Sequence, residues 1–570
     1  MKAKLTKKSK DKRQIAKGKS EIVFCLSIII CLLFSSLPAL GQPNKDEDVI
    51  IRALQDELKR SMDQLRLKEF EKPYFIEYVV EDEDKLEVEA KFGGILNSNR
   101  QRKRTLFTQV RIGSYEFDNS SEYSNSFRLP LPMPLDDDYT AIRRSAWFVT
   151  DFAYKQAIDQ LASKKATKQS QPEEDEEEKL PPLSKEEPVI SVEKRGTLEV
   201  DQEKWEKQMR AWSAMFRKFP EIQDSTLSFY VRHVNRYLIN SEGTRVLEPK
   251  LLITLNMYAE SLTPDNIRLT PSRHIYAKNF DEFPSEQEVA QVINDLAQDL
   301  AKLRTAPQFE GKYVGPALFT DRAAVQLFLQ LLAPNLDSSG LVERLDRKVL
   351  PTFLSVIDDP MQKKFGNFNL IGDYRLDAQG IAAKPLTLVE NGVLKTLLAT
   401  REPTKEFPRS NGRGRSGGNG NVQAMISNMF VQAKGGKSFA ELKQQLIEAC
   451  RAQSLSYGIL FREIDSTFTP EGNELAVPIK AYKVYVEDGR EELVRNTDIF
   501  DLSVRELRQI LAAGNDAYAF NILIGNGHQG EGIPVSIVVP SVLLDEIDLR
   551  KDTTAKERPM ILTHPFFSKQ

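Results

Sequence analysis

Hydrophobic residues recur at two spacings along the chain, and these spacings separate the expected helices from the expected strands. Apolar residues three and four positions apart are typical of a helix with one buried face, and strict alternation is typical of a half-buried strand. In the first half, the helical spacing covers residues 47–66, 139–164, 201–219 and 285–304, and alternation covers residues 73–82, 85–92, 105–117 and 225–261. Residues 73–117 predict an antiparallel meander, and residues 225–261 predict strands around a tight Ser-Glu-Gly-Thr turn.

A short apolar helix opens the second half of the chain. Its sequence, AAVQLFLQLLAP over residues 323–334, follows Asp321, a residue type that suits a helix N-cap. One face carries Ala324, Leu327, Phe328, Leu331 and Leu332. After Asp321 this helix offers no His, Asp, Glu or Cys, so it presents a packing face and no metal ligand.

The rest of the second half reads mostly as strands. Residues 384–401 predict a hairpin with Asn391-Gly392 as its turn, and residues 438–453 predict a helix. Strand patterns return at residues 474–495 and 533–547. Helices combined with antiparallel strands in both halves favour an α+β fold over a doubly wound α/β fold.

These patterns divide the chain into three regions. Residues 1–41 form an expected signal peptide, and residues 42–307 form an N-terminal α/β-mixed domain with antiparallel strands. Within that domain, residues 164–188 are acidic and poor in large apolar residues, which indicates a solvated linker. Residues 308–570 form a β-rich C-terminal domain.

The N-terminal region predicts export. A basic stretch precedes the apolar run at residues 22–34, and small residues at Ala39 and Gly41 suit a cleavage site before Gln42. We therefore expect a periplasmic or extracellular protein, with an uncleaved N-terminal membrane anchor as the alternative. Residues 1–41 hold nine Lys/Arg and two acidic residues, and the formal net charge of the whole chain is −3. The remaining chain is thus mildly acidic, which does not favour a nucleic-acid partner.

The chemistry-bearing residues are sparse. The chain has four His, at 233, 274, 528 and 564, and no two of them can share a helix face. His528 with Glu531 is one conceivable ligand pair. The carboxylates Asp358, Asp359, Asp373 and Asp377 could gather, although DDP and LDAQG are also ordinary turn sequences. The chain has no G-x-S-x-G motif, and outside residues 1–41 its one Cys is Cys450 on a helix, so nothing indicates a serine or cysteine nucleophile.

An ordered series of motifs resembles the TldD/PmbA family, metallopeptidase-related proteins long labelled modulators of DNA gyrase. The series comprises YVGPALFTDRAAVQLFLQLLAP, DAQGIAAKPLTLVENGVLKTLLATR, SNGRGRSG, ISNMFVQAKGGKSFAELKQQL and GEGIPVSIVVPSVLLDEI, with RYLINSEGT before them. The likeness covers about residues 225–550. It implies a β-rich C-terminal domain of the TldD/PmbA type.

The chain departs from this family at its metal motif. Active members carry H-E-x-x-x-H on the helix and a Cys ligand near the C-terminus. The resemblance sets Leu329 at the first His, Gln330 at the Glu and Pro334 at the second His, and it sets Asn526 near the Cys. Leucine cannot bind a metal, an amide has no usable proton affinity at neutral pH, and proline ends the helix.

The resemblance therefore implies a non-catalytic, metal-free protein with no cofactor. We expect an exported peptide-binding or chamber-forming partner subunit of a metalloprotease complex, so enzyme activity is uncertain and not favoured. The expected partners are a peptide or unfolded segment, and a homo- or heterodimer with a metal-bearing paralogue. Peptide binding is assigned to Asn411, Arg413, Arg415 and Asn428, with a plain mobile loop at residues 412–417 as the alternative.

Two other functions stay open at this point. One is an active zinc metallopeptidase with relocated ligands, most plausibly His528 with Glu531 or Asp377. The other is a homodimeric, non-enzymatic scaffold.

Overall fold

The computed structural model describes residues 48–120, 128–170, 180–338, 340–418, 420–465, 475–525, 531–553, 556–559 and 561–562. It divides into two units, residues 1–52 and 53–570. Of the first unit, residues 48–52 are described, and they include the start of helix α2 (Val49–Gln64). The expected signal peptide at residues 1–41 lies outside the described residues. No helix in the described part of the chain is long and apolar enough to span a membrane.

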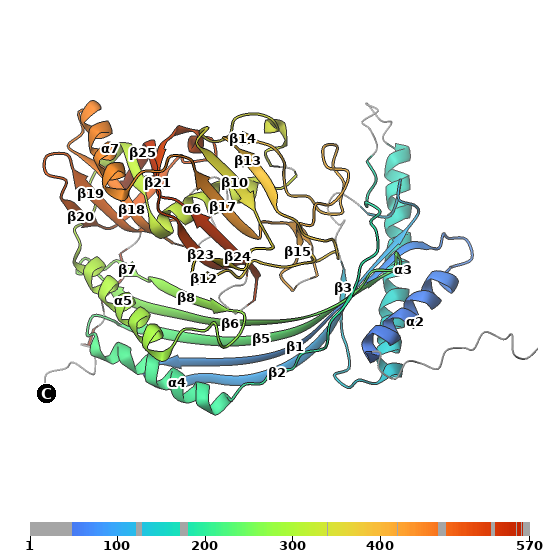
Figure 1. Ribbon diagram of the computed structural model, residues 1–570. Helices are drawn as coiled ribbons and strands as arrows, with labels where there is room; N and C mark the ends of the chain where they lie inside the picture. The colour runs from blue at the N-terminus through green and yellow to red at the C-terminus, as the bar shows by residue number, and fades with distance from the viewer. Residues whose placement is uncertain are drawn as a thin grey trace, which may run out of the picture. The chain divides into compact units, whose positions relative to one another are not determined.

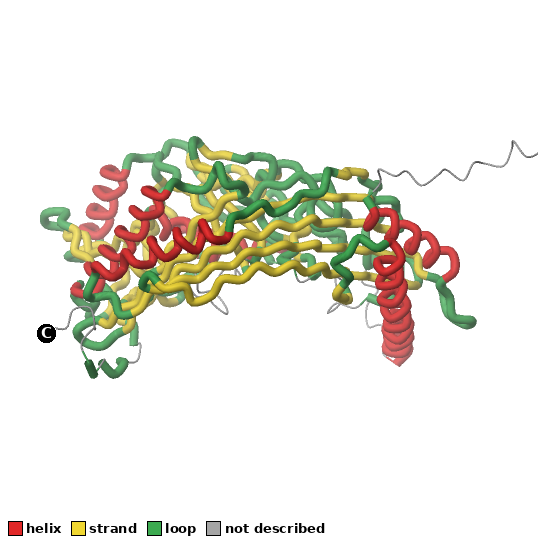
Figure 2. Tube along the Cα trace, turned by 90° about the horizontal axis from the view of Figure 1, so that it is seen from below, coloured by secondary structure: helices red, strands yellow, loops and turns green. Residues whose placement is uncertain are grey.

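An eight-stranded sheet forms the N-terminal half of the second unit. Its strand order is β3-β2-β1-β5-β6-β4, and β7 and β8 also pair with β6. The strands are β1 (Pro73–Lys91), β2 (Gly94–Ile112), β3 (Leu129–Pro132), β4 (Ile190–Val192), β5 (Asp224–Asn240), β6 (Arg245–Leu262), β7 (Arg268–Leu269) and β8 (Ser272–Ala277). Figures 1 and 2 show the four long strands β1, β2, β5 and β6 running side by side. The antiparallel pairing expected within residues 73–117 is present in β1 with β2, and a second antiparallel pair, β5 with β6, joins it because β5 pairs with β1.

Helices cover one face of this sheet. Helix α4 (Gln202–Ala214), the 3-10 turn η1 (Met215–Lys218) and helix α5 (Glu286–Thr305) pack on apolar residues of β1, β5 and β6. Fully buried Met209, Val289, Phe229 and Leu255 belong to this core. Ser285 and Glu288 begin α5 with a capping box, as their spacing predicts.

Helix α3 (Tyr139–Ser170) contacts β2 and β3. The Tyr78 hydroxyl on β1 is hydrogen-bonded to Thr150 on this helix at 2.6 Å. The face expected to be buried is buried: Ile142, Ala146, Val149, Ala153, Ala157 and Leu161 are each 7% exposed or less.

Two mixed sheets form the C-terminal half. The six-stranded sheet has the order β14-β13-β10-β17-β24-β23, the seven-stranded sheet has β20-β19-β18-β9-β25-β21, and β22 pairs with β25. Their strands are β9 (Lys312–Phe319), β10 (Leu354–Asp358), β13 (Leu386–Glu390), β14 (Val393–Leu394), β17 (Asn428–Ala433), β18 (Tyr457–Ile464), β19 (Pro478–Tyr485), β20 (Glu491–Val494), β21 (Thr497–Phe500), β22 (Ile510–Ala513), β23 (Tyr518–Ile524), β24 (Ile533–Val539) and β25 (Val542–Lys551). Two short ladders, β11 (Lys364–Phe365) with β12 (Phe368–Asn369) and β15 (Gly414–Arg415) with β16 (Gln423–Ala424), lie outside both sheets.

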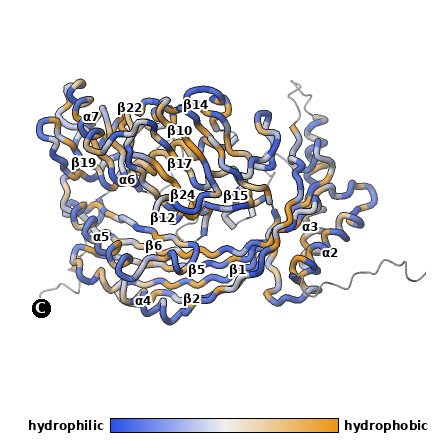
Figure 3. Tube along the Cα trace, in the orientation of Figure 1, coloured by the Kyte–Doolittle hydropathy of each residue, from blue (hydrophilic) through white to orange (hydrophobic). Residues whose placement is uncertain are grey.

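One hydrophobic core joins both C-terminal sheets to helix α6 (Asp321–Leu331). Phe328 of α6, Val356 of the six-stranded sheet and Phe461 of the seven-stranded sheet are all 0% exposed in this core. Figure 3 shows the hydrophobic colouring of β10, β17 and β24. Helix α7 (Phe439–Ala452) packs on the seven-stranded sheet through Leu442, Leu446 and Cys450.

The predicted hairpin at residues 384–401 is confirmed in its central part. Strands β13 and β14 pair with Val389 opposite Leu394, and Asn391 and Gly392 have φ of 46° and 81°. Positive φ at both central residues is what a tight hairpin turn requires.

Three details differ from the sequence-based expectation. Residues 164–170 continue helix α3, and Leu183 and Ser184 are buried, so the segment 164–188 is solvated in part only. The Ser184 carbonyl accepts hydrogen bonds from the Arg401 guanidinium, an interaction with a distant residue that a local acidic composition cannot reveal. At helix α6, Thr320 holds the N-cap position and Asp321 is the first helical residue.

Candidate functional site

The end of helix α6 is built for packing. Leu329 is 9% exposed and belongs to the C-terminal core, and Pro334 lies in the 3-10 turn η2 (Ala333–Asn335) that follows the helix. The Gln330 amide makes three hydrogen bonds. Its Nε2 donates to Gln326 Oε1 at 2.8 Å and to the Asp465 carbonyl at 3.2 Å, and its Oε1 accepts from the Ala476 N–H at 2.7 Å.

These residues do not fit a zinc ion. A zinc site needs three protein ligands that are His, Cys, Asp or Glu. Among the described residues, no three such side chains gather closely enough to hold a metal ion. Asn526 and His528 lie outside the described residues.

The two described histidines are structural in character. His233 on β5 is 7% exposed, and burial lowers the pKa of its imidazole. Burial, with Arg322 and Arg273 nearby, lowers the pKa of His274 to about 4. With this pKa the ring is neutral at pH 7, and its Nδ1 lies 2.8 Å from Asn256 Oδ1, within hydrogen-bond distance.

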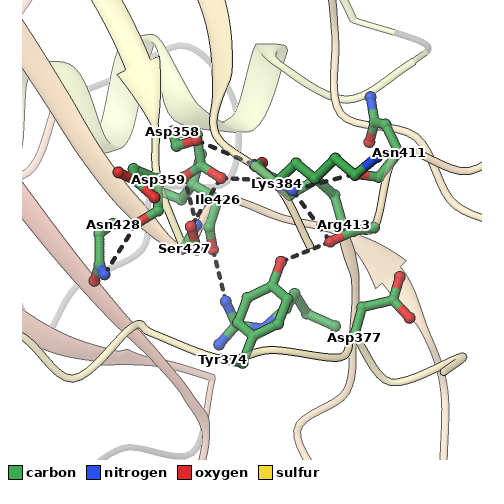
Figure 4. Close-up of polar contacts among 12 residues, drawn as sticks. Asp358, Asp359, Tyr374, Asp377, Lys384, Asn411, Arg413, Ile426, Ser427 and Asn428 are labelled. Carbon is green, nitrogen blue, oxygen red and sulfur yellow. Dashed lines mark hydrogen bonds and ion pairs between the residues drawn. The ribbon is translucent and has the colours of Figure 1, made fainter. Parts of the chain in front are cut away.

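Arg413 is the centre of a buried polar cluster, which Figure 4 shows with its dashed contacts. Arg413 and Asp358 are both 0% exposed, and Arg413 Nε donates to Asp358 Oδ2 at 2.5 Å. The other oxygen of Asp358 accepts the Ser427 N–H at 2.7 Å. Arg413 also donates to the carbonyl of Lys384 at 2.6 Å. The cluster therefore joins four segments of the C-terminal half, at residues 358, 384, 413 and 427.

The two asparagines assigned to peptide binding are engaged within the chain. Asn411 donates to the Leu397 carbonyl at 2.7 Å and accepts the Ala399 N–H at 2.9 Å. Asn428 is 0% exposed and donates to the Gln362 carbonyl at 2.7 Å. Both side chains, like Arg413, position backbone segments, and their assignment to a bound peptide stays a prediction.

Arg415 lines a cavity of about 350 Å³. Its guanidinium donates to the carbonyls of Ile426 at 3.1 Å and Pro534 at 2.8 Å, and it lies 4.4 Å from the centre of the Tyr374 ring. These contacts, together with those of Arg413, hold residues 413–415 in place, so this segment does not behave as a plain mobile loop. Of the four predicted peptide-binding residues, the structure places one at the cavity.

The cavity lies between the eight-stranded sheet and loops of the C-terminal half. The sheet contributes Glu81, Arg232, Val234, Arg236 and residues 248–252, and Lys278 follows β8. The C-terminal half contributes residues 371, 373, 374, 376–378, 415–418, 532 and 534. The volume is within the range of pockets that hold small ligands.

Strand register explains why this wall is charged. Glu81 pairs with Arg236, and Arg236 pairs with Glu248, so the three side chains lie on one face of the sheet. The opposite face is the apolar one that α4 and α5 cover. Three ion pairs lie along this wall: Lys250 Nζ is 2.9 Å from Glu248 Oε2, and Arg232 and Lys278 form ion pairs with Glu83 and Asp373. The lining thus carries charges of both signs, and three of its cations, Arg232, Lys250 and Lys278, form ion pairs.

The sequence-based search missed these sheet residues. Their signal is the alternation itself, since charged residues occupy positions 232 and 236 and positions 248 and 250 at the period of a strand. These residues come from three strands, and the strand pairing that places them side by side cannot be read from one sequence.

Asp377 is the buried carboxyl group of the cavity. It is 2% exposed, and burial raises its pKa to about 6. Its Oδ1 accepts the N–H groups of Gln379 and Ile381, and its Oδ2 accepts the N–H of Gly414, each at 2.9 Å. Asp377 therefore ties the DAQG turn, predicted from its sequence, to the Arg413 segment.

Asp377→Asn should change the pH dependence of stability. A carboxyl group with a raised folded pKa stabilises the fold most when it is protonated, so its contribution is lost as the pH rises from about 4 through 6. Relative to the asparagine variant, the wild type should lose on the order of 2 kcal/mol over that window. Urea unfolding of both proteins from pH 4 to 7.5 measures this difference, and parallel curves would contradict it.

Fold and site together define an α+β protein whose C-terminal half resembles a metallopeptidase domain, and Leu329, Gln330 and Pro334 offer no side chain of a zinc-ligand type. Residues 293–551 match the family model of the PmbA/TldA metallopeptidase C-terminal domain. A protein named Metalloprotease from Methanothermobacter thermautotrophicus is 28% identical over 338 residues, which are 56% of this chain and 68% of that protein. A second protein of that name, from Archaeoglobus fulgidus, is 34% identical over 108 residues, which are 19% of this chain and 23% of that protein.

A solved structure shows the same fold. The crystal structure of TldE from Thermococcus kodakarensis aligns with a TM-score of 0.57 and 13% identity, over 87% of this chain and all of that chain. These similarities support the TldD/PmbA family as the family of this chain.

Proposed function

We propose that the chain is an exported, non-catalytic TldD/PmbA-family protein that binds a peptide segment in the cavity at Arg415. It would act as a peptide-binding or chamber-forming partner of a metal-bearing relative. The observation that carries this proposal is Gln330. Where active relatives place the catalytic Glu, this chain has an amide that holds residues 465 and 476 by hydrogen bonds.

The cavity lining supports a peptide as the ligand. Carboxylates and cations alternate along its walls, and a peptide offers both N–H donors and carbonyl acceptors to such a surface. Arg236 and Arg415 also line the cavity and donate to backbone carbonyls, so the wall offers a ligand cationic side chains beside its ion pairs.

Filling the cavity should abolish peptide binding. Val234 lies in the sheet wall and is 6% exposed, so Val234→Trp adds volume at the cavity. Polarisation of a fluorescent mixture of unstructured peptides should show binding to the wild type and at least roughly tenfold weaker binding to this variant. Leu96→Trp, at a 58% exposed position outside the cavity lining, is the matched control. Equal binding by all three proteins would refute the cavity as the peptide site.

The alternative of an active peptidase relies on His528 with Glu531 or Asp377. The Asp377 oxygens accept three backbone N–H groups, and Glu531 lies 3.5 Å from Lys85 and 3.9 Å from Lys103. The carboxylate oxygens of Asp377 and Glu531 would have to give up these contacts in order to bind a metal ion. If the alternative holds, His528→Ala abolishes peptide hydrolysis.

The remaining alternative is a homodimeric, non-enzymatic scaffold. It differs from the partner-subunit proposal in the protein that is expected to co-purify with this chain. A pull-down from native envelope extract should retain a relative with an intact H-E-x-x-x-H motif if the partner-subunit proposal holds. Recovery of this chain alone favours the scaffold.

A further inference from the structure

Two arginines that line the cavity, Arg236 on β5 and Arg415 on β15, donate hydrogen bonds to neutral oxygen atoms. Arg236 donates to the Ala378 carbonyl, and Arg415 donates to the carbonyls of Ile426 and Pro534. Each arginine is 9% exposed. In the part of the chain that the structure describes, neither guanidinium forms an ion pair with a carboxylate. Two buried cations at one cavity therefore lack a directly bonded counter-charge.

One backbone contact connects the two arginines. The Ala378 N–H donates to the Gly414 carbonyl at 2.7 Å, while the Ala378 carbonyl accepts the hydrogen bond from Arg236. Arg415 directly follows Gly414, and its guanidinium lies against the Tyr374 ring, which also lines the cavity. Both cations are therefore held around the same turn of the cavity wall.

Every carboxylate of the lining, by contrast, already has a donor. The four carboxylates and their partners are Glu81 with Arg232, Glu248 with Lys250, Asp373 with Lys278, and Asp377 with the N–H groups of residues 379, 381 and 414. A ligand amine would have to displace one of these donors. A ligand carboxylate can instead use the remaining N–H groups of two guanidinium groups, each of which has five. The cavity therefore favours the anionic end of a ligand.

Backbone without side chains lies beside these cations. Gly417 and Gly418 line the cavity shortly after Arg415 in the chain. A Cβ on Gly418 would lie 3.5 Å from both Arg232 Nη2 and Glu81 Oε2, so a side chain there would occupy the space between the loop and the sheet. Glycine allows the main chain of a ligand to approach closely. The end of a peptide needs such an approach, because its carboxylate is attached directly to the main chain.

We propose that Arg236 and Arg415 bind the free C-terminal carboxylate of a peptide whose last residues enter the cavity. Guanidinium groups form strong, charge-assisted hydrogen bonds with carboxylates, and buried arginines that are already held in place lose little freedom on binding. This inference rests on the proposed function, which places a peptide in the cavity, and it names the part of the peptide that the cavity recognises.

Paired peptides that differ only at the C-terminus test this inference. Each short, unstructured peptide carries an uncharged fluorophore at its N-terminus and no acidic side chain. It is made once with a free C-terminal carboxylate and once with a C-terminal amide. Fluorescence polarisation at pH 7, with the full chain in non-ionic detergent, should show roughly thirtyfold tighter binding of the free acid, as expected for charge-assisted hydrogen bonds.

Glutamine variants assign this preference to the two arginines. Arg236→Gln and Arg415→Gln each remove one positive charge and keep an amide donor, and each should reduce the ratio of acid to amide affinity below about fivefold. Arg304→Gln is the matched control, because Arg304 also donates to a backbone carbonyl, that of Leu262 at 3.0 Å, and lies outside the cavity lining. It should leave the ratio unchanged. A general loss of folded protein weakens both peptides alike, so it cannot change this ratio.

The outcomes separate this inference from the proposed function. Equal binding of acid and amide by the wild type would overturn the inference and leave peptide binding in place, whereas binding of neither peptide would contradict the proposed function itself. A preference that both Arg236→Gln and Arg415→Gln retain would also overturn the inference. An amidated peptide with one internal Glu that binds as tightly as the free acid would assign the two arginines to an acidic side chain and not to the end of a chain.

Discussion

Arg413→Leu should destabilise the protein by about 3–5 kcal/mol, the usual cost of removing one partner of a buried ion pair. The side chains of Arg413 and Asp358 are both fully buried, so the leucine variant leaves the Asp358 carboxylate without its counter-charge in a dry environment. It also removes the donor to the Lys384 carbonyl. Chemical denaturation at pH 7 measures the loss as a lower midpoint.

Two further variants separate the ion pair from the general loss of an arginine. Arg409 lies in the same loop, and its side chain is 63% exposed while paired with Glu186. Arg409→Leu should leave the midpoint unchanged within error, because exposed pairs contribute little. Adding Asp358→Asn to Arg413→Leu should recover part of the loss, because the remaining buried group is then neutral. A full-size effect in Arg409→Leu, or none in Arg413→Leu, would contradict the account.

Gln330→Glu should destabilise the protein by about 2–4 kcal/mol at pH 7, although it restores the residue type that active relatives carry. The Gln330 Nε2 donates to two oxygen atoms, and a carboxylate oxygen in its place would repel both. Hydrolysis of peptides should not appear. The loss should shrink toward pH 4, because a protonated glutamic acid can again donate one hydrogen bond.

The same substitution on the surface provides the control. Gln291 on α5 is exposed and donates to Asp295 Oδ1 at 2.8 Å. Gln291→Glu should change stability much less, since water can solvate the new charge. A stable Gln330→Glu protein would show that this amide is not needed to hold residues 465 and 476.

Local sequence patterns predict much of the fold. The buried face of α3, the capping box of α5 and the Asn391-Gly392 turn depend on residues within one helix or turn, so their signals are complete in a short window. The end of α3 is different. Residues 164–170 look like a linker by composition, yet the helix continues through them.

The candidate site is less predictable because it depends on pairing between distant strands. The loop sequence GRGRSG suggests two free arginines, but Arg413 is neutralised by Asp358, 55 residues earlier. The wall with Glu81, Arg236 and Glu248 forms only when β1, β5 and β6 are in register. The absence of His, Asp, Glu and Cys from residues 322–334, by contrast, can be read from the sequence alone.

The central claim is that this chain holds no catalytic metal. Its most direct test is the zinc content of the purified full chain, measured by mass spectrometry after dialysis against excess zinc and then against metal-free buffer. The account predicts far less than one zinc per chain and no peptide hydrolysis. One tightly held zinc per chain, together with hydrolysis that a chelator stops, would contradict it.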